Sequence, residues 1–157
     1  MMISIQIPDF GALALDHLVL DYNGTLAVDG VLLPGVKEAL NSLSRDLTVH
    51  VVTADTFGKA GDGLKGIDCR LTVLEPGRQD QAKLNFVNGL GAAQTASIGN
   101  GRNDALMLEA SALGIAVILG EGASSASLKA ADVVCLNIVD ALELLTHPLR
   151  LTATLRC

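Results

Sequence analysis

The chain has 157 residues and a formal net charge of −6, and this length suits one compact domain with a sizeable core. The acidic surplus argues against nucleic-acid backbones and anionic membranes as general partners, because binding to their phosphates requires clustered Lys and Arg. Hydrophobic residues make up 50% of the chain but aromatic residues only 3%. The core must therefore be aliphatic, as in a buried parallel sheet, and we expect one α/β domain over residues 1–157.

We expect neither a membrane-spanning helix nor an export signal in this sequence. Its longest apolar stretches, such as residues 113–119, are far shorter than the roughly 20 residues of a membrane-spanning helix. The first residues lack a basic segment followed by an apolar one, so we expect a cytoplasmic protein. Cys69, Cys135 and Cys157 are odd in number and widely spaced, which favours buried thiols over a disulfide framework or a zinc site.

Residues 1–16 predict a β-hairpin ahead of the main fold. Three isoleucines alternate with polar residues up to a turn signal at residues 8–11, and residues 12–15 form the returning strand. We interpret this hairpin as an addition at the edge of the domain.

From residue 17 to residue 146, short apolar runs alternate with segments of helical spacing. The predicted strands are 17–21, 47–52, 70–74, 95–98, 115–119 and 133–136. The predicted helices are one that begins at Pro34, then 56–64, 79–90, 104–112 and 138–145. An unbroken series of strand–helix units predicts a doubly wound, mainly parallel sheet, and residues 147–157 follow it as a C-terminal tail.

Several predicted strands lead into polar residues that suit phosphate chemistry. Asp21, Thr53 and Asn100 follow the first, second and fourth strands, and ligands of doubly wound sheets bind beyond the carboxyl ends of the strands. A phosphoryl group requires a nucleophile, hydroxyl or amide donors, and a cation such as Lys83. Taken singly, Asp21 is more often a turn residue and Lys83 a solvated helix residue; their joint order favours a site.

The motifs 21–26 (DYNGTL), 53–55 (TAD), Lys83 and 99–104 (GNGRND) resemble, in order and spacing, the four motifs of the haloacid-dehalogenase-like (HAD) superfamily. More narrowly, the chain resembles small proteins described as soluble P-type ATPases, which are similar to the phosphorylation domain of ion pumps. The resemblance extends from the first motif to the last predicted helix. It implies a Rossmann-like fold and Mg²⁺-dependent phosphoryl transfer.

The resemblance also implies a role for each matching residue in the metal site. Asp21 would form an aspartyl phosphate and bind Mg²⁺, the backbone carbonyl of Asn23 would be a second metal ligand, and Asn100 occupies the position of the usual metal-binding aspartate. Asn23 stands where the related phosphatases carry the aspartate that protonates the leaving group.

The same resemblance implies how the phosphate is held. Gly24, Thr53 and Ala54 would bind the phosphate oxygens through hydroxyl and amide groups. Lys83 would neutralise the nucleophile and the phosphoryl group, and Asp104 would hold Lys83 and metal-bound water in place.

Two asparagines depart from the family pattern and narrow the expected chemistry. The amide of Asn23 can neither donate nor accept the proton in the way that a carboxylate does, and Asn100 brings no charge to a Mg²⁺ ion. We therefore expect weaker metal binding and leaving groups of low pKa, such as nucleotide or acyl phosphates. The resemblance implies a phosphorylated substrate, either small or macromolecular.

The connections in which the superfamily often inserts a cap domain are short, between Thr25 and Pro34 and again at residues 75–77. We expect no cap domain and an open site. A large substrate, or a second subunit of a homo-oligomer, would then cover the site and exclude water.

Alternative interpretations rest on fewer residues. The glycine pattern of residues 61–66 matches a dinucleotide fingerprint but does not follow a strand directly, and Asp21 comes too early in the chain for the acceptor of a receiver domain. The main alternative is a non-catalytic phosphate-binding or regulatory scaffold in which Asn23 and Asn100 record lost chemistry. The three histidines show no metal spacing, and Ser124 predicts a helix cap.

Overall fold

The computed structural model describes residues 2–157 and is built on a six-stranded parallel sheet. Its strands are β3 (His17–Leu20), β6 (Thr48–Thr53), β7 (Arg70–Val73), β8 (Thr95–Gly99), β9 (Leu113–Val117) and β10 (Val133–Cys135). Their order across the sheet is β10-β9-β8-β3-β6-β7. The first strand of the sheet therefore lies between the second and the fourth, which is the Rossmann order with its switch point between β3 and β8.

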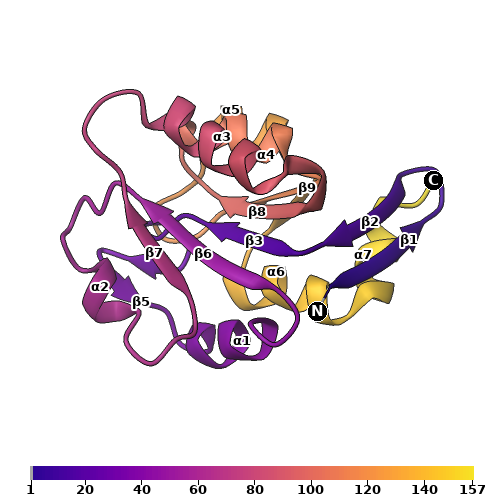
Figure 1. Cartoon of the computed structure of the whole chain (residues 1–157), viewed down its shortest axis with the longest axis horizontal. Coiled ribbons are helices and arrows are strands. Elements are labelled where there is room, and N and C mark those ends of the chain that lie inside the picture. Colours follow the sequence, from indigo (N-terminus) through magenta and orange to yellow (C-terminus); the bar gives the residue numbers. More distant parts are fainter. Residues whose placement is uncertain (1) are drawn as a thin grey trace.

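Helices cover both faces of the sheet, as the alternating sequence pattern predicts. They are α1 (Val36–Leu43), α2 (Ala60–Gly63), α3 (Gln79–Leu90), α4 (Ala105–Ala110), α5 (Ser125–Ala130), α6 (Ile138–Thr146) and α7 (Pro148–Leu155), with 3₁₀ turns η1 (Ala92–Gln94) and η2 (Arg102–Asp104). Figure 1 shows α3, α4 and α5 on one side of the sheet and α1 and α6 on the other. The predicted doubly wound α/β architecture is confirmed.

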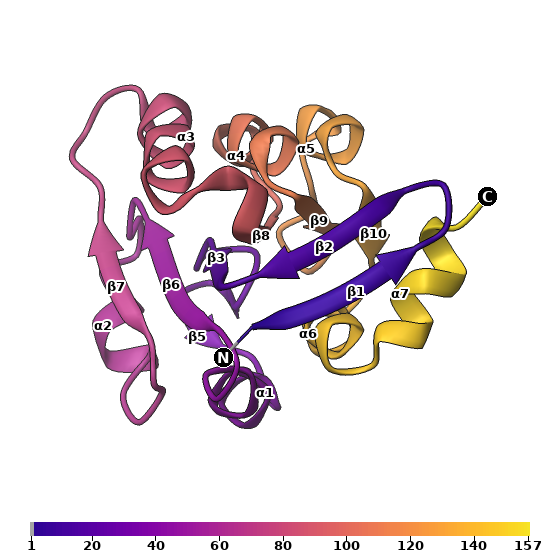
Figure 2. The ribbon, with the colours of Figure 1, turned by 45° about the vertical axis from the view of Figure 1, so that its right-hand side comes forward.

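The predicted N-terminal hairpin is also confirmed. Strands β1 (Ile3–Ile7) and β2 (Gly11–Leu15) pair antiparallel and run outward from the main sheet beside α7 (Figure 2). The segment that we predict only as a tail contains helix α7. Pro148 occupies its first turn, where a missing N–H costs nothing, and Leu151 is fully buried, so the hairpin and the last helix cover each other.

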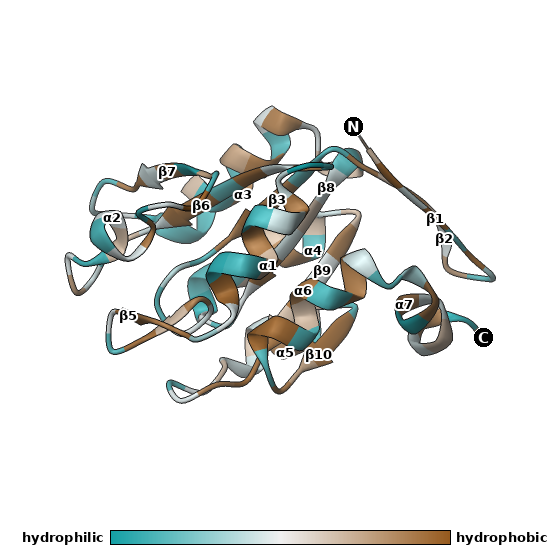
Figure 3. Ribbon diagram, turned by 90° about the horizontal axis from the view of Figure 1, so that it is seen from below, coloured by the Kyte–Doolittle hydropathy of each residue, from teal (hydrophilic) through white to brown (hydrophobic). Residues whose placement is uncertain are grey.

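Alternation along each strand divides the core between the two faces of the sheet. Leu18 and Leu20 belong to the larger cluster, on the side of α1 and α6, whereas Val19 packs with Val52 in the smaller cluster on the opposite side. Figure 3 shows hydrophobic colour on parts of the strands, and both hydrophobic and hydrophilic colours on α1 and α6. Among residues 2–157, no helix combines the length and apolar character needed to cross a membrane.

The connection after β3 contains a small hairpin that the sequence analysis does not predict. Its strands β4 (Ala27–Val28) and β5 (Val31–Leu32) pair antiparallel through a two-residue turn in which Asp29 (φ 53°) and Gly30 (φ 79°) are both left-handed, as type I′ hairpins require. The buried hydroxyl of Tyr22 donates to the carbonyl of Gly30 over 3.1 Å. This contact fixes the β4–β5 hairpin to the loop that follows the central strand.

Two helices differ from their predicted extents. The helix predicted over residues 56–64 is reduced to α2, because Asp55 and Gly58 adopt positive φ values of 53° and 67° that a helix cannot contain. Helix α5 is shorter than our predicted helices and was not predicted as an element. Its predicted cap is present, however, since the N–H group of Ala126 donates to the Ser124 hydroxyl over 3.2 Å.

Candidate active site

The carboxyl ends of β3, β6 and β8 bring the predicted site residues to one pocket. Asp21, Thr53 and Asn100 all line this cavity of about 210 Å³, which lies at the switch point of the sheet. The remaining residues that line it are Asn23, Ala54, Thr56, Gly101, Asn103 and Glu121. Three distant segments of sequence therefore meet where the order of the strands predicts a ligand.

Lys83 reaches this site from α3 and is completely enclosed. Its Nζ atom lies 3.1 Å from Oδ1 of Asp21, 2.7 Å from Oδ1 of Asp104 and 3.3 Å from Oδ1 of Asn103. The exposed fraction of the Lys83 side chain is 0%, and that of Asp21 is 10%. The ammonium group is therefore aimed at the one carboxylate of the cluster that is open to the pocket.

Asp104 organises the turn between β8 and α4. Its second oxygen, Oδ2, accepts from the N–H groups of Asn100 (3.0 Å) and Gly101 (2.9 Å). A Cβ atom at Gly99 would collide with this carboxylate, so the glycine gives Asp104 room beside the strand. One carboxylate thus fixes both the Asn100 backbone and the Lys83 ammonium group.

The buried charges do not cancel, because one ammonium group faces two carboxylates. Burial and, to a lesser degree, the neighbouring Asp104 raise the pKa of Asp21 to about 7, against the opposing influence of Lys83. Burial disfavours the ammonium form of Lys83, but attraction to Asp104 and Asp21 outweighs it and raises the pKa of that group. The buried cluster of Lys83, Asp21 and Asp104 thus has a surplus of one negative charge, which a proton or a metal cation would offset.

Asn100 is held in one orientation by partners at both ends of its amide. Thr25 donates its hydroxyl to Oδ1 over 3.2 Å, and Nδ2 donates to the Gly122 carbonyl over 3.0 Å. Gly24 has a φ of 79°, and a Cβ atom there would collide with this amide. An aspartate at position 100 would direct an oxygen at the Gly122 carbonyl, so the loop after β9 suits an amide.

The structure places Gly24 apart from Thr53 and Ala54, the other hydroxyl and amide donors that we predict to bind phosphate. Its N–H group already donates to the carbonyl of Ala27 over 2.7 Å, and Gly24 does not line the pocket. Thr53 is better placed, since its Oγ1 accepts from the N–H group of Asp55 over 2.9 Å and so keeps its own proton available for a donor bond to an anion. Ala54 lines the pocket beside it.

The oxygens around Asp21 suit a hard divalent cation. Oδ1 of Asn23 is buried and has no hydrogen-bond partner, and Asp21 and Asn100 line the same pocket as Asn23. Mg²⁺ prefers such oxygen ligands, and the surplus negative charge favours it. Among residues 2–157, no group of three or more His, Cys, Asp or Glu side chains is suited to a metal ion, so amide and backbone oxygens would complete the coordination.

Glu121 and Asn103 are lining residues that the sequence analysis does not identify. Glu121 follows β9, and its Oε2 accepts from the N–H group of Asp29 in the β4–β5 hairpin over 3.1 Å. Its place after a parallel strand is the only signal in the sequence that could have indicated it. Asn103 lies inside a recognised motif, but its contact with Lys83 depends on how α3 packs.

Comparison with known sequences finds short similarities to uncharacterised proteins. No family model matches the chain. An uncharacterised protein of Methanocaldococcus jannaschii, MJ0073, is 50% identical over 60 residues, which cover 38% of this chain and 64% of that protein. The chain therefore matches less than two thirds of this relative.

Solved structures provide the broader comparison. The 3-deoxy-D-manno-octulosonate 8-phosphate phosphatase of Moraxella catarrhalis, in complex with magnesium, phosphate and the KDO sugar, superposes with a TM-score of 0.70 at 14% identity, over 85% of this chain and 86% of that one. The catalytic domain of the CPx-ATPase CopB-B superposes with a TM-score of 0.60 at 23% identity, over 73% of this chain and 46% of that one.

The fold and the pocket define a Rossmann-like α/β protein with an acidic residue, a buried lysine and a polar turn at its switch point. The chain has the fold of the HAD superfamily, and it is structurally close to the 3-deoxy-D-manno-octulosonate 8-phosphate phosphatases and to the CPx-ATPase catalytic domain. The fold expected from the four motifs is therefore confirmed.

Proposed function

We propose that this chain is a Mg²⁺-dependent phosphohydrolase or phosphotransferase that acts through an aspartyl phosphate on Asp21. The observation that carries the proposal is the position of the Asp21 carboxylate, open to the pocket at the switch point with the Lys83 ammonium group 3.1 Å away. The lysine supports a negatively charged phosphoryl group beside a carboxylate nucleophile. We propose that residues 1–157 form a single domain with this activity.

In the first step, an oxygen of Asp21 attacks the phosphorus of the donor. The phosphorus–oxygen bond to the leaving group breaks, and the leaving oxygen keeps the bonding electron pair. The Thr53 hydroxyl and the neighbourhood of Ala54 bind the phosphoryl oxygens. Mg²⁺, held by oxygens of Asp21, Asn23 and Asn100, would supply electrostatic neutralisation of the phosphoryl group.

The nature of the leaving group follows from Asn23. Its amide cannot protonate the departing oxygen, so the leaving group must depart as an anion. Nucleotide and acyl phosphates satisfy this condition because their leaving groups are weak bases. Simple sugar phosphates, whose alkoxide is a strong base, would react slowly.

In the second step, water attacks the phosphorus of the aspartyl phosphate and the bond to Asp21 breaks, returning its electron pair to the carboxylate. The proton of the water passes to the phosphate product or to solvent, since Asn23 cannot accept it. We expect this step to be slow and the phosphoenzyme to accumulate. A large phosphorylated substrate or a second copy of the chain would exclude water from the open pocket.

Labelling with acetyl phosphate tests the proposal. With Mg²⁺ present, the labelled phosphoryl group should be found on Asp21, and Asp21→Asn should abolish the labelling. Asn23→Asp should shorten the lifetime of the label and extend turnover to ester substrates. A protein that binds phosphate but is never labelled, by acetyl phosphate or by nucleotides, would instead be a phosphate-binding or regulatory scaffold.

A further inference from the structure

A second cavity lies beside the reaction pocket and shares a residue with it. It has a volume of about 510 Å³ and is lined by Gly77, Arg78, Gln79, Asp80, Arg102 and Asn103. Asn103 also lines the pocket that contains Asp21. A donor with its phosphoryl group over Asp21 would therefore extend past Asn103 into this larger space.

Asn103 is fixed between the two cavities. Its Oδ1 accepts from the Lys83 ammonium group over 3.3 Å, and its Nδ2 donates to Oε1 of Gln79 over 3.3 Å. These contacts join the turn after β8 to the first two turns of α3. Asn103, which lines both cavities, is thus bonded to the same lysine that faces the nucleophile.

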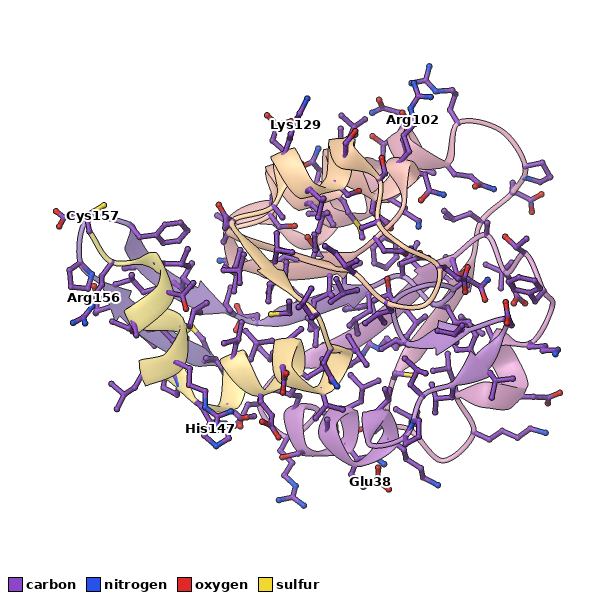
Figure 4. The ribbon with its side chains drawn as sticks, turned by 180° about the vertical axis from the view of Figure 1, so that it is seen from behind. Glu38, Arg102, Lys129, His147, Arg156 and Cys157 are labelled. Carbon is purple, nitrogen blue, oxygen red and sulfur yellow. The ribbon has the colours of Figure 1, made fainter. Side chains whose placement is uncertain are left out.

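The charged side chains that line the second cavity have a net positive charge, whereas the chain as a whole is negative. Arg78 donates from Nε and Nη2 to the two oxygens of Asp80, each over 3.1 Å, in an ion pair whose arginine side chain is 80% exposed. Arg102 is exposed and points away from the ribbon (Figure 4), and it forms no salt bridge among residues 2–157. Two guanidinium groups and one carboxylate thus line this cavity, in a chain whose net charge is −6.

We propose that this second cavity is an anion subsite, in which Arg102 and Arg78 bind a negative charge that the leaving group carries before transfer. The inference rests on the proposed phosphoryl transfer at Asp21 and narrows its substrates to donors with a second anion, a phosphate or a carboxylate. Planar guanidinium groups bind both kinds of anion in paired hydrogen bonds. Positive charge at this position also stabilises the negative charge on the departing oxygen. This stabilisation compensates for the protonation that Asn23 cannot provide.

The test compares donors with and without the second anion. Pyrophosphate carries a second phosphate, phosphoenolpyruvate carries a carboxylate, and acetyl phosphate carries neither. In Arg102→Gln, the ratio of kcat/KM for pyrophosphate to kcat/KM for acetyl phosphate should fall about tenfold, mainly through KM. The same ratio is measured for phosphoenolpyruvate relative to acetyl phosphate. If Arg102→Gln lowers only the phosphoenolpyruvate ratio, the second anion is a carboxylate. If it changes neither ratio, the subsite is overturned.

Arg45→Gln is the matched control, because Arg45 is exposed, loses the same charge and lines neither cavity. It should leave both ratios as in the parent protein. A change as large as that of Arg102→Gln would show that net charge, and not the cavity, sets the preference.

A binding measurement separates this inference from the proposed catalysis. In the Asp21→Asn background, which cannot be phosphorylated, calorimetry should show pyrophosphate binding that Arg102→Gln weakens about tenfold and Arg45→Gln does not. Equal binding by the three proteins overturns the subsite even if Asp21 proves to be a nucleophile. Conversely, weakened binding without any labelling of Asp21 supports the subsite and rejects the proposed reaction.

Discussion

The Nζ atom of Lys83 lies 2.7 Å from Oδ1 of Asp104, and both side chains are completely buried. Asp104 does not line the reaction pocket. Its contact with Lys83 therefore positions the ammonium group, which a bound substrate would then contact. Through its other oxygen Asp104 also binds two backbone N–H groups, so both oxygens of the carboxylate are required as acceptors.

Asp104→Asn should therefore destabilise the fold and disable the site. The amide has only one acceptor oxygen, so its NH₂ group must face either the ammonium group or the backbone N–H groups. We expect the free energy of unfolding to fall by about 3–5 kcal/mol, as measured by urea denaturation, together with loss of Asp21 labelling. Asp62→Asn, at an exposed ion pair with Lys65, is the control and should change neither the free energy of unfolding nor the labelling of Asp21. If the Asp104→Asn protein were as stable as the parent, Asp104 would not have the supporting role that we assign to it.

Mg²⁺ binding should depend on pH through Asp21. Because burial raises the pKa of this carboxyl to about 7 and the metal requires the ionised form, binding must displace a proton below that pH. The apparent affinity should rise by up to about tenfold per pH unit until pH 7 and then level off. Calorimetry in buffers of different ionisation enthalpy would detect the released proton. Affinity that does not vary from about pH 5 to pH 8 would rule out Asp21 as the titrating ligand.

Gly24→Ala should show how closely the turn after β3 fits Asn100. The φ of 79° is unfavourable for alanine, and the added Cβ collides with the Asn100 amide. Gly58→Ala is a matched control, because φ there is 67° but no atom lies within 4 Å of the added Cβ. Denaturation should show a loss of about 1 kcal/mol for Gly58→Ala and about 1–3 kcal/mol more for Gly24→Ala. Equal losses would mean that the Asn100 amide yields without cost.

The sequence predicts most of the sheet because the signal there is local. Each central strand is a short apolar run, and strand–helix alternation with right-handed crossovers leaves few sheet orders. The β4–β5 hairpin has strands of two residues, which are too short for any periodicity. Strand β9 begins at Leu113 and not at Ile115 as predicted, because the apolar run extends further than the strand and packing selects the paired residues.

The site is predicted in part for the same reason. Asp21, Thr53 and Asn100 each follow a strand, so their meeting follows from topology. The contact of Lys83 with Asn103 and the second cavity depend on the packing of α3 against η2, which no local pattern encodes. The hydrogen bond that occupies the Gly24 N–H group likewise depends on the unpredicted β4–β5 hairpin.

The last prediction concerns two histidines beneath α3, whose spacing in the sequence indicates no metal site. His50 is 3% exposed; its Nε2 lies 3.3 Å from Nδ1 of His17, and its ring packs edge-on against Phe86. Burial, followed by His17 and Arg70, lowers the pKa of His50 from 6.5 to about 4. The folded protein therefore keeps this imidazole neutral.

Stability should consequently fall as the pH decreases from about 6.5 to about 4, because over this range the unfolded chain binds a proton on His50 that the folded chain does not. The contribution of the neutral His50 to the free energy of unfolding is fully present above pH 6.5. Between pH 6.5 and about pH 4 the free energy of unfolding falls by about 3 kcal/mol through this residue. His50→Gln cannot titrate and retains an amide beside His17, so its unfolding free energy should decline less over the same range. Urea denaturation of both proteins at several pH values measures the difference, and parallel declines would show that another group is responsible.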